Sequence, residues 1–356
     1  MPKKIVLVIS SLGGGGAESI LVRMSKYLCD LGYNVVFVTL DFPVLKEKHV
    51  LDPKIKRVII FYRGYSFSSK MYSTIKRFIA LRRLIKTEKP FVVLSFMTPT
   101  NILTIIATIG LNVKCIVSER TDPSRFSYGY IYDFLTKSLY RFSDKVIVQT
   151  EAICNFLRNR YKADISIIPN FINNKSEVIL PRLEKRIIAV GRLVDNKNFR
   201  LLIFAFYRLR KSFPEWTLHI IGEGEQRQNL ENLILSLELN NKVILHGYVS
   251  NPFPMLMSSS LFVQTSIFEG FPNVLLEAMS CGLPVISTEE TGYMLIKHNV
   301  NGLLFPSGDI DQLVLQLNRL MLNNNLRESL GLEALKVRVD YHIDKIMAQW
   351  LNVLFS

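Results

Sequence analysis

Cysteine is scarce in this sequence, and disulfide or metal-binding spacings are missing. The 356 residues include four cysteines, Cys29, Cys115, Cys154 and Cys281, and none of them forms a CxxC pair. This spacing implies neither a disulfide framework nor a zinc site, and it favours a reducing, cytoplasmic setting. Charged residues amount to 21% and hydrophobic residues to 49%, a balance that excludes disorder, collagen and coiled coil as the main content.

Uninterrupted apolar segments of membrane-spanning quality are also lacking. Residues 90–113 carry no charge and are long enough on paper to cross a bilayer. A Thr-Pro-Thr-Asn sequence at 98–101 interrupts them, which favours a strand, a polar turn and a helix that begins near Asn101. The apolar run at the N-terminus stops at two serines and four glycines, too early for a secretory signal. We expect neither a membrane span nor a signal peptide.

Positive charge is concentrated in the first half of the chain. Residues 1–170 hold 26 Lys or Arg and 12 Asp or Glu, whereas residues 171–356 hold 18 of each, so the first half carries the whole net charge of +14. Residues 54–89 alone contain eleven basic side chains and one acidic side chain. We expect an anion-attracting surface there, for which phospholipid, nucleic acid or a phosphorylated substrate is the candidate partner.

The central part of this basic segment, residues 68–88, has the pattern of an amphipathic helix, with apolar residues at helical spacing and basic residues between them. Basic amphipathic helices bind anionic membranes, and each basic residue contributes about 1 kcal/mol. A helix that packs on the core and leaves its basic side in solvent is the alternative. The predicted membrane and acceptor surface consists of Lys70, Lys76, Arg77, Arg82, Arg83 and Lys86.

Short β-rich runs alternate with helical patterns, which predicts parallel sheets covered by helices on both faces. One series occupies residues 1–170 and a second occupies residues 187–340, and the polar segment 171–186 between them is typical of an interdomain linker. The predicted fold is α/β, with two doubly wound, Rossmann-like domains in tandem. Ligands of such sheets bind beyond the carboxyl ends of the strands, so we expect the site in a cleft between facing domains.

A glycine-rich loop, residues 11–18, follows the first predicted strand and opens a helix. Backbone amides at this helix start, at Gly15 and Gly16, suit phosphate or sugar oxygens. The loop lacks the GK[ST] ending of a P-loop and the GxGxxG spacing of a dinucleotide site, which makes P-loop ATPase chemistry an unfavoured interpretation. A glycine turn that only permits close packing of the helix is the alternative.

The segment GRLVDNKN, residues 191–198, lies between a strand and a helix of the second domain. It places the guanidinium of Arg192 and the ammonium of Lys197 at the carboxyl edge of the sheet, where two cations suit a diphosphate. A solvated loop can carry the same residue types, and the sequence leaves both interpretations open.

The most specific pattern is FEGFPNVLLEAMSCGLPV, residues 268–285, in which a loop joins a strand to a helix that begins near Asn273. Glu269 lies on the loop, within reach of a sugar, and Glu277 lies one helical turn inside, where it can accept hydrogen bonds from ribose hydroxyls. Two carboxylates neutralised by surface cations are the alternative. The predicted donor-binding residues of this segment are Gly270, Phe271, Pro272, Asn273, Val274 and Glu277.

In this order, GGGGAE, GRLVDNKN, IIGEGEQRQNLE, FEGFPNVLLEAMSCGLPVIST and NGLLFP resemble the retaining nucleotide-sugar glycosyltransferases of family 4, which have the GT-B fold and an E-x7-E motif. The resemblance covers nearly the whole chain. It implies Arg192 and Lys197 on the donor diphosphate, Glu277 on the ribose and Glu269 on the transferred sugar. It also implies that the glycine loop closes over the donor and that a C-terminal helix at 341–356 packs back on the first domain.

One departure concerns the histidine that many family 4 enzymes carry in the first domain near the reacting sugar. The matching region here, residues 117–123, has no histidine. Arg120 or Glu119 could replace it, by polarising the leaving phosphate or by ordering the acceptor, and a salt bridge between the two is the alternative. The candidate catalytic residues are Glu269, Arg192, Lys197 and Arg120.

We expect no metal ion or other cofactor. The five histidines form no HxxxH or HxH set. Asp309 and Asp311 spell the DxD signature of the other glycosyltransferase fold, but they precede an amphipathic helix, and we interpret them as its cap. Arg192, Lys197 and helix dipoles would then balance the diphosphate charge.

The expected function is transfer of a hexose or N-acetylhexosamine, with retention, from a nucleoside diphosphate sugar, with UDP favoured, to a lipid-linked saccharide in surface polysaccharide assembly. The enzyme is expected to be cytoplasmic and peripherally bound to the inner membrane. The rivals are a GT-B epimerase that cleaves a UDP-sugar without an acceptor, and a basic nucleic-acid-binding protein. Since no RNP, KH or helix-turn-helix pattern is present, no nucleic acid is expected as a partner.

Overall fold

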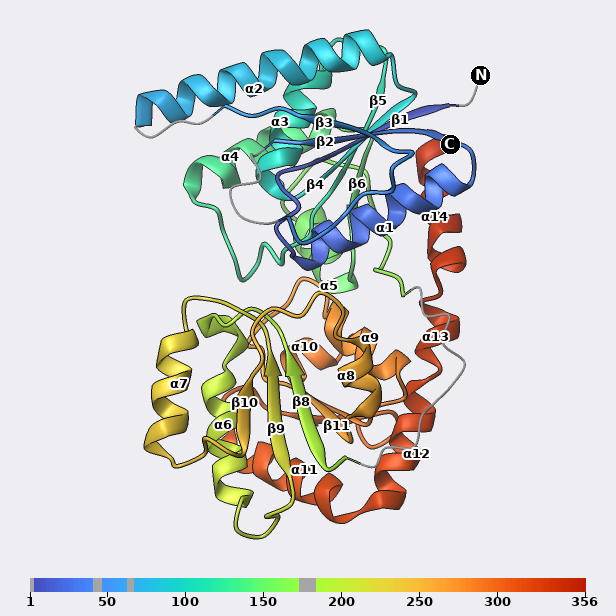
Figure 1. The fold of residues 1–356 in the computed structure, drawn as a ribbon. Helices are drawn as coiled ribbons and strands as arrows, with labels where there is room; N and C mark the ends of the chain where they lie inside the picture. The colour runs from blue at the N-terminus through green and yellow to red at the C-terminus, as the bar shows by residue number, and fades with distance from the viewer. Residues whose placement is uncertain (1–2, 41–46, 63–66, 173–183) are drawn as a thin grey trace. The chain divides into compact units, whose positions relative to one another are not determined.

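The structure is a computed structural model that describes residues 3–40, 47–62, 67–172 and 184–356, with side chains from residue 71 onward in the third range. The chain divides into two compact units (Figure 1). Unit 1 comprises Met1–Asn170 and Asp344–Ser356, and unit 2 comprises Phe171–Ile343. Each unit is built on one parallel sheet.

Unit 1 has a seven-stranded sheet in the order β3-β2-β1-β4-β5-β6-β7. Its strands are mostly runs of β-branched residues that are buried on both faces, as a parallel sheet between helices requires. The strands are β1 (Lys4–Ile9), β2 (Asn34–Thr39), β3 (Lys56–Ile59), β4 (Val92–Phe96), β5 (Lys114–Ser118), β6 (Lys145–Val148) and β7 (Ile165–Ile167).

Helices cover this sheet in two layers. The core on one face joins Val6 and Val93 of the sheet to Leu81 and Leu103 of two helices. On this face α2, α3 and α4 pack side by side in that order (Figure 1). The helices of unit 1 are α1 (Gly16–Asp30), α2 (Phe67–Glu88), α3 (Thr98–Thr108), α4 (Tyr130–Leu139), the short 3-10 turn η1 (Tyr140–Phe142), α5 (Glu151–Arg158) and α14 (Ile343–Phe355).

The C-terminal helix α14 is part of unit 1 from Asp344 onward. Phe355 stacks on Tyr33 with ring centroids 4.8 Å apart, and Trp350 lies 6.1 Å from Phe96. The ammonium of Lys114 donates a 2.8 Å hydrogen bond to the carbonyl of Val353, which places a cation at the negative end of the helix. Aromatic packing and one cap therefore fix this helix on the sheet of unit 1.

Unit 2 has a six-stranded sheet in the order β10-β9-β8-β11-β12-β13, with one hydrophobic core on each face. The strands are β8 (Arg186–Val190), β9 (Thr217–Ile221), β10 (Val243–Leu245), β11 (Leu261–Gln264), β12 (Val285–Thr288) and β13 (Leu303–Phe305). The helical segments are η2 (Asp195–Lys197), α6 (Phe199–Leu209), α7 (Arg227–Ser236), α8 (Phe253–Ser258), α9 (Asn273–Ser280), α10 (Glu289–Gly292), α11 (Ile310–Leu322), α12 (Asn324–Ala334) and α13 (Val337–Asp340). The predicted fold class, two doubly wound α/β units, is confirmed.

Two local predictions can be compared with these bounds. The helix expected to begin near Asn101 begins at Thr98 instead, so the predicted polar turn is wrong. Pro99 lies in the first turn of α3, where a residue without an N–H costs no hydrogen bond. The cap interpretation of the DxD sequence is confirmed, because Asp309 accepts a 3.0 Å hydrogen bond from the amide of Gln312 at the start of α11.

None of the helices in the described ranges combines the length and the apolar run that crossing a membrane requires. The uncharged region 90–113, which is long enough to cross a bilayer, is divided between β4 and α3. The predicted linker at 171–186 lies largely outside the described residues, which resume at Glu184.

Candidate active site

The sheet of unit 2 reverses its strand order between β8 and β11. From β8 the chain proceeds to β9 on one side, and from β11 it proceeds to β12 on the other. The loops that follow β8 and β11 therefore leave the same edge of the sheet as neighbours, and such a switch point is where open α/β sheets bind ligands. Both loops carry candidate site residues, at 191–198 and at 265–273.

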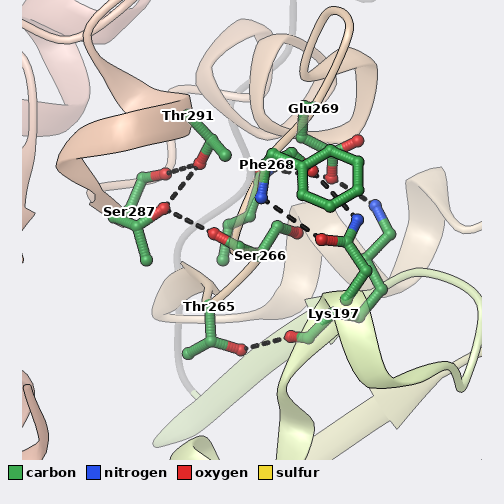
Figure 2. Close-up of polar contacts among 10 residues, drawn as sticks. Lys197, Thr265, Ser266, Phe268, Glu269, Ser287 and Thr291 are labelled. Carbon is green, nitrogen blue, oxygen red and sulfur yellow. Dashed lines mark hydrogen bonds and ion pairs between the residues drawn. The ribbon is translucent and has the colours of Figure 1, made fainter. Parts of the chain in front are cut away.

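Asn196 joins the two loops. Its side-chain amide donates a 3.0 Å hydrogen bond to the carbonyl of Phe268, and its own carbonyl accepts a 2.9 Å bond from the amide of Ile267. The hydroxyl of Thr265 donates a 2.8 Å bond to the carbonyl of Lys197 (Figure 2). No local sequence pattern singles out Asn196 or Thr265, because their partners lie about seventy positions away in the chain.

This junction brings Lys197 and Glu269 together. The ammonium and the carboxylate form an ion pair, and the two side chains keep exposed fractions of 20% and 16% (Figure 2). Gln264 at the end of β11 donates a 3.3 Å hydrogen bond to the same carboxylate oxygen. Two of the predicted catalytic side chains, Lys197 and Glu269, therefore contact each other at the sheet edge. The third, Arg192, lies exposed on the loop that carries Lys197.

Two glycines after β9, whose role the sequence alone does not indicate, allow this arrangement. A Cβ atom on Gly222, which has a φ of +149°, would lie 1.8 Å from the carbonyl oxygen of Gly191. A Cβ atom on Gly224 would lie 2.3 Å from the carbonyl oxygen of Leu193. The turn after β9 therefore packs directly on the loop that presents Arg192, which is a mechanical reason for the GEG sequence.

Helix α9 begins at Asn273 and ends at Ser280, as the sequence predicts. Phe271 and Pro272 are buried in front of it, and Phe271 packs 6.1 Å from the ring of Tyr341. These two side chains fix the loop, so only their backbone is available to a ligand. Glu277 lies one turn inside the helix and is partly exposed. Gly270, Asn273 and Val274 are partly exposed around the helix start.

Hydroxyl groups tie the same loop to the next strand. Thr288, at the end of β12, donates a 2.7 Å hydrogen bond to the carbonyl of Ser266. The hydroxyl of Thr291 lies 2.8 Å from that of Thr288 and 3.0 Å from that of Ser287 (Figure 2). All four residues are buried, so the base of the loop is rigid.

In unit 1 the glycine loop follows β1. Gly15 is the N-cap of α1 and Gly16 is its first residue. A Cβ atom on Gly15 would lie 2.2 Å from a carboxylate oxygen of Glu18, which is the end of a flexible side chain and can move away, so packing alone does not require a glycine there. The amide of Lys48 donates a 3.1 Å hydrogen bond to the carbonyl of Leu12 and holds this loop against the segment after β2. A contact of Gly15 and Gly16 with the donor stays a prediction.

Glu119, at the end of β5, is buried and fully occupied. Its carboxylate accepts hydrogen bonds from the hydroxyls of Thr98 at 2.8 and 2.9 Å, Tyr140 at 2.8 Å and Thr121 at 3.1 Å, and from the amide of Arg120 at 3.2 Å. Burial raises the pKa of this carboxyl, and the donated hydrogen bonds oppose the rise. Because four groups donate hydrogen bonds to this carboxylate, it anchors the loop and retains little capacity to bond to a substrate.

Arg120 is the opposite case. Its guanidinium lies over the ring of Phe96, 3.6 Å from the centroid, and one nitrogen donates to the side chain of Asn170. Its Nε and Nη2 atoms are buried and have no hydrogen-bond partner among the described residues. Burial lowers its pKa to about 9, against the raising effect of the Glu119 charge, so it remains a cation at neutral pH. Glu119 and Arg120 thus have separate partners, and Arg120 keeps spare donors.

The basic helix α2 does not offer all its cations to a surface partner. Arg82 donates hydrogen bonds of 2.9 and 2.8 Å to the carbonyls of Ala107 and Ile109, which caps the end of α3. Arg77 donates a 3.2 Å bond to the carbonyl of Tyr62. These two residues therefore serve the fold, which revises the predicted surface. The side chain of Lys70 lies outside the described residues, and the others of the set are Lys76, Arg83 and Lys86.

No group of three or more His, Cys, Asp or Glu side chains with metal-binding geometry occurs within the described ranges. Asp309 is engaged in capping α11, and Asp311 forms an exposed ion pair with Arg208.

Two protein-family models match the chain. "Glycosyltransferase Family 4" matches residues 14–175, and "Glycosyl transferases group 1" matches residues 171–337. Together they account for nearly all of both units, with their boundary at the junction between them.

Individual proteins match over nearly full length. An uncharacterized glycosyltransferase of Haemophilus influenzae is 29% identical over 99% of this chain and 100% of its own length. An α-1,4-N-acetyl-D-galactosaminyltransferase of Campylobacter jejuni, whose name gives GalNAc-α-(1->4)-GalNAc-α-(1->3)-diNAcBac-PP-undecaprenol, is 29% identical over 99% of this chain and 98% of its own. Among solved structures, a mutant TarM of S. aureus in complex with fondaparinux, α-GlcNAc-glycerol and UDP superimposes with a TM-score of 0.83 at 16% identity, over 99% of this chain and 100% of that one.

Proposed function

The chain belongs to glycosyltransferase family 4 and has the GT-B fold, and we propose that it is a sugar transferase of surface polysaccharide assembly. In this proposal it transfers a hexose or an N-acetylhexosamine from a UDP-sugar to a lipid-linked saccharide. The proposed transfer retains the anomeric configuration. The observation that carries the proposal is the ion pair of Lys197 and Glu269 at the switch point of the unit 2 sheet, because open α/β sheets bind ligands at such a point.

The donor is proposed to lie across the two joined loops of unit 2. Lys197 and Arg192 would bind the diphosphate, together with backbone amides at the start of α9. Glu277 would accept hydrogen bonds from the ribose, and Glu269 would bind hydroxyls of the transferred sugar. UDP as the nucleotide is supported by the UDP in the matched TarM structure. Because side-chain cations balance the diphosphate charge in this arrangement, the proposed reaction needs no metal ion.

Of the two first-domain candidates, we propose Arg120 as the residue that acts on substrate. Its two unpartnered buried nitrogens are donors that a phosphate oxygen would satisfy. Glu119 is proposed as a positioning residue, since its hydrogen bonds fix the loop that presents Arg120. This assignment gives Arg120 the place of the histidine found in many family 4 enzymes.

The proposed chemistry needs no protein nucleophile. The bond between the anomeric carbon and the β-phosphate oxygen breaks as the acceptor hydroxyl oxygen forms the new glycosidic bond on the same face, and the hydroxyl proton passes to the departing phosphate. Fixed cations and amides would stabilise the charge that develops on the leaving diphosphate, and such groups contribute about 10²-fold to 10³-fold each. Exclusion of water would limit hydrolysis of the donor.

The acceptor is proposed to be a saccharide on a lipid diphosphate, because the Campylobacter jejuni relative is named for such a substrate. Peripheral binding to an anionic membrane follows as part of the proposal. The exposed Arg83 and Lys86 on α2 support it, together with Lys76, whose ammonium lies over the ring of Tyr72.

The test is a panel of nucleotide sugars in a thermal-shift assay, followed by transfer to a lipid-diphosphate saccharide with and without EDTA. A ligand that binds the native state raises the melting temperature. We expect UDP-sugars to do so, and product formation to survive EDTA. Release of UDP without any acceptor would instead favour an epimerase. If no nucleotide sugar of the panel raises the melting temperature, the proposal is overturned.

A further inference from the structure

Helix α4 turns apolar side chains outward. Tyr130, Ile131 and Phe134 have exposed fractions of 95%, 71% and 68%, and Phe126 just before the helix has 42%. The opposite side of the helix already serves the core, through Tyr132, Leu135 and Leu139. Since an amphipathic helix of a globular domain needs only one apolar side, the second apolar side of α4 is left for a partner.

The rim of this apolar face is positive. Arg125, Lys137 and Arg141 are exposed around it. The two nearby carboxylates have local partners: Asp122 accepts hydrogen bonds from the amide and hydroxyl of Ser124 at 2.9 and 2.6 Å, and Asp133 accepts a 2.8 Å bond from the hydroxyl of Ser127. These hydrogen bonds leave both carboxylates charged, so the three cations and two anions give the rim a net charge of +1, and this positive balance suits an anionic partner.

The apolar surface continues across the neighbouring helices of the layer. Helix α3 lies between α2 and α4, with contacts to both (Figure 1). Ile106 and Ile109 are exposed on and next to α3, and Met71, Ile75 and Ile79 are exposed on α2 at 59%, 50% and 51%. One layer of unit 1 thus combines exposed apolar side chains on three elements with basic side chains on two of them.

The location of α4 adds a chemical argument. The loop that joins β5 to α4 begins with Glu119 and Arg120, and α4 starts ten positions later. The same loop thus carries Arg120, which has two buried donors without a partner among the described residues, and leads into the helix with the apolar face. An amphiphile with a phosphate head and an apolar tail matches this order of features.

We infer that α4 inserts Tyr130, Ile131 and Phe134 into an anionic lipid bilayer and forms a membrane contact beside the basic helix α2. Aromatic side chains with flanking cations are typical of the membrane interface. A second copy of the chain fits less well, because its own basic rim would be repelled, and a nucleic acid would leave the apolar side chains without a partner. The inference deepens the proposed membrane association and does not depend on the identity of the donor sugar.

A tryptophan reporter tests the insertion directly. The chain has two tryptophans, and Trp216 and Trp350 are both 1% exposed, so their fluorescence is insensitive to a surface contact. In a Tyr130→Trp variant we expect a blue shift of the emission with phosphatidylglycerol vesicles and quenching by lipids with brominated chains. A Leu332→Trp variant, at an exposed position of unit 2, is the matched control and should show neither.

Sedimentation with the same vesicles separates this contact from the electrostatic one. A Tyr130→Ser, Ile131→Ser, Phe134→Ser triple variant should bind about tenfold more weakly than the parent protein at high salt, because insertion of apolar groups is not screened by salt. The control triple, Leu322→Ser, Leu332→Ser and Val339→Ser, removes apolar side chains of unit 2 that are 63% to 72% exposed, and it should leave vesicle binding unchanged.

The inference is overturned if the Tyr130→Trp variant binds vesicles while its emission is neither shifted nor quenched. It is also overturned if the α4 triple variant changes its oligomeric state and still binds vesicles as the parent protein does. The thermal shift by UDP, measured on the same proteins, keeps the two proposals apart. A normal UDP shift with failed insertion rejects the α4 contact alone, whereas insertion without any nucleotide-sugar response rejects the proposed transfer alone.

Discussion

The ammonium of Lys197 pairs with the carboxylate of Glu269, 72 positions later in the chain, at the edge where β8 and β11 lie side by side. Lys197→Ala should lower the turnover of a UDP-sugar by about 10²-fold to 10³-fold, because in the proposed site it removes the cation that would bind the leaving diphosphate. Lys185→Ala breaks the exposed pair with Glu215 and is the matched control. Near-normal turnover of Lys197→Ala with saturating donor would contradict the assignment.

The pair also predicts how the two residues act together. If the donor binds both groups, Lys197→Ala and Glu269→Gln should have effects on kcat/KM that are not additive, since the residues are in contact. A double-mutant cycle of the four proteins measures this coupling. Strictly additive effects would mean that the two side chains act on the substrate independently.

Glu277 gives a prediction about donor affinity. Its position one turn inside α9 suits a hydrogen bond with ribose, and a charge-assisted bond of this kind contributes about 1.5 to 3 kcal/mol. Glu277→Ala should therefore raise the donor KM and the Kd for UDP by about tenfold to a hundredfold, without unfolding the protein. Glu231→Ala on the exposed surface of α7 is the control. Equal UDP affinity of both variants in calorimetry would remove Glu277 from the site.

Arg120 and Glu119 should respond in opposite ways. Arg120→Lys keeps a charge but loses the planar fork, so it should reduce turnover by about 10²-fold with little change in the urea midpoint. Glu119→Gln places an amide N–H among donors and leaves buried hydroxyls unpaired, which costs about 1 to 3 kcal/mol of unfolding free energy. The measurement is turnover and urea unfolding on both variants. A stable Glu119→Gln protein with lost activity would reverse the roles.

The sequence predicts the fold well because both sheets are built from clear signals. Strands such as β1 and β2 are runs of Val, Ile and Phe between turn residues, and these runs suit only the interior of a parallel sheet. The sequence does not indicate β7 or α5, because β7 is a three-residue strand at the sheet edge and the eight-residue α5 lacks the Pro and Gly that bracket α9. The sequence places the start of α3 three residues too late, because a proline in the first turn of a helix resembles a proline in a loop.

The sequence predicts which residues belong to the candidate site but not which of them bond to one another. The loops with Lys197 and Glu269 were identified from their positions after strands, yet nothing local to either loop indicates that Asn196 bonds to Phe268. The same limit explains Arg82, which belongs to a basic helical pattern but caps α3. The packing of α2 against α3 decides which basic side chains bond to a carbonyl and which remain in solvent. The residue pattern of a single helix does not contain this information.

The remaining cations of α2 carry a salt-dependent prediction. A Lys76→Ser, Arg83→Ser, Lys86→Ser variant should bind anionic vesicles about a hundredfold more weakly at low salt, since each basic residue contributes about 1 kcal/mol near the surface. Arg82→Ser, in contrast, should lower the stability of the protein, because it uncaps α3. Vesicle sedimentation and urea unfolding separate the two effects. Unchanged binding of the triple variant would reject α2 as an anchor.

A histidine pair in unit 2 predicts a loss of stability in mild acid. His219, which is 7% exposed, and His246 place ring nitrogens 2.8 Å apart, and burial, with the charge of Arg186, lowers the pKa of His219 to about 4. The folded state therefore binds fewer protons than the unfolded state between about pH 6.5 and pH 4, so the stability that neutral His219 provides is lost as the pH falls through this window. At pH 5 the loss should reach about 2 kcal/mol relative to pH 7. Urea unfolding at both pH values should show a smaller difference for His219→Gln, and an equal difference would mean that the pair is not what makes unit 2 acid-sensitive.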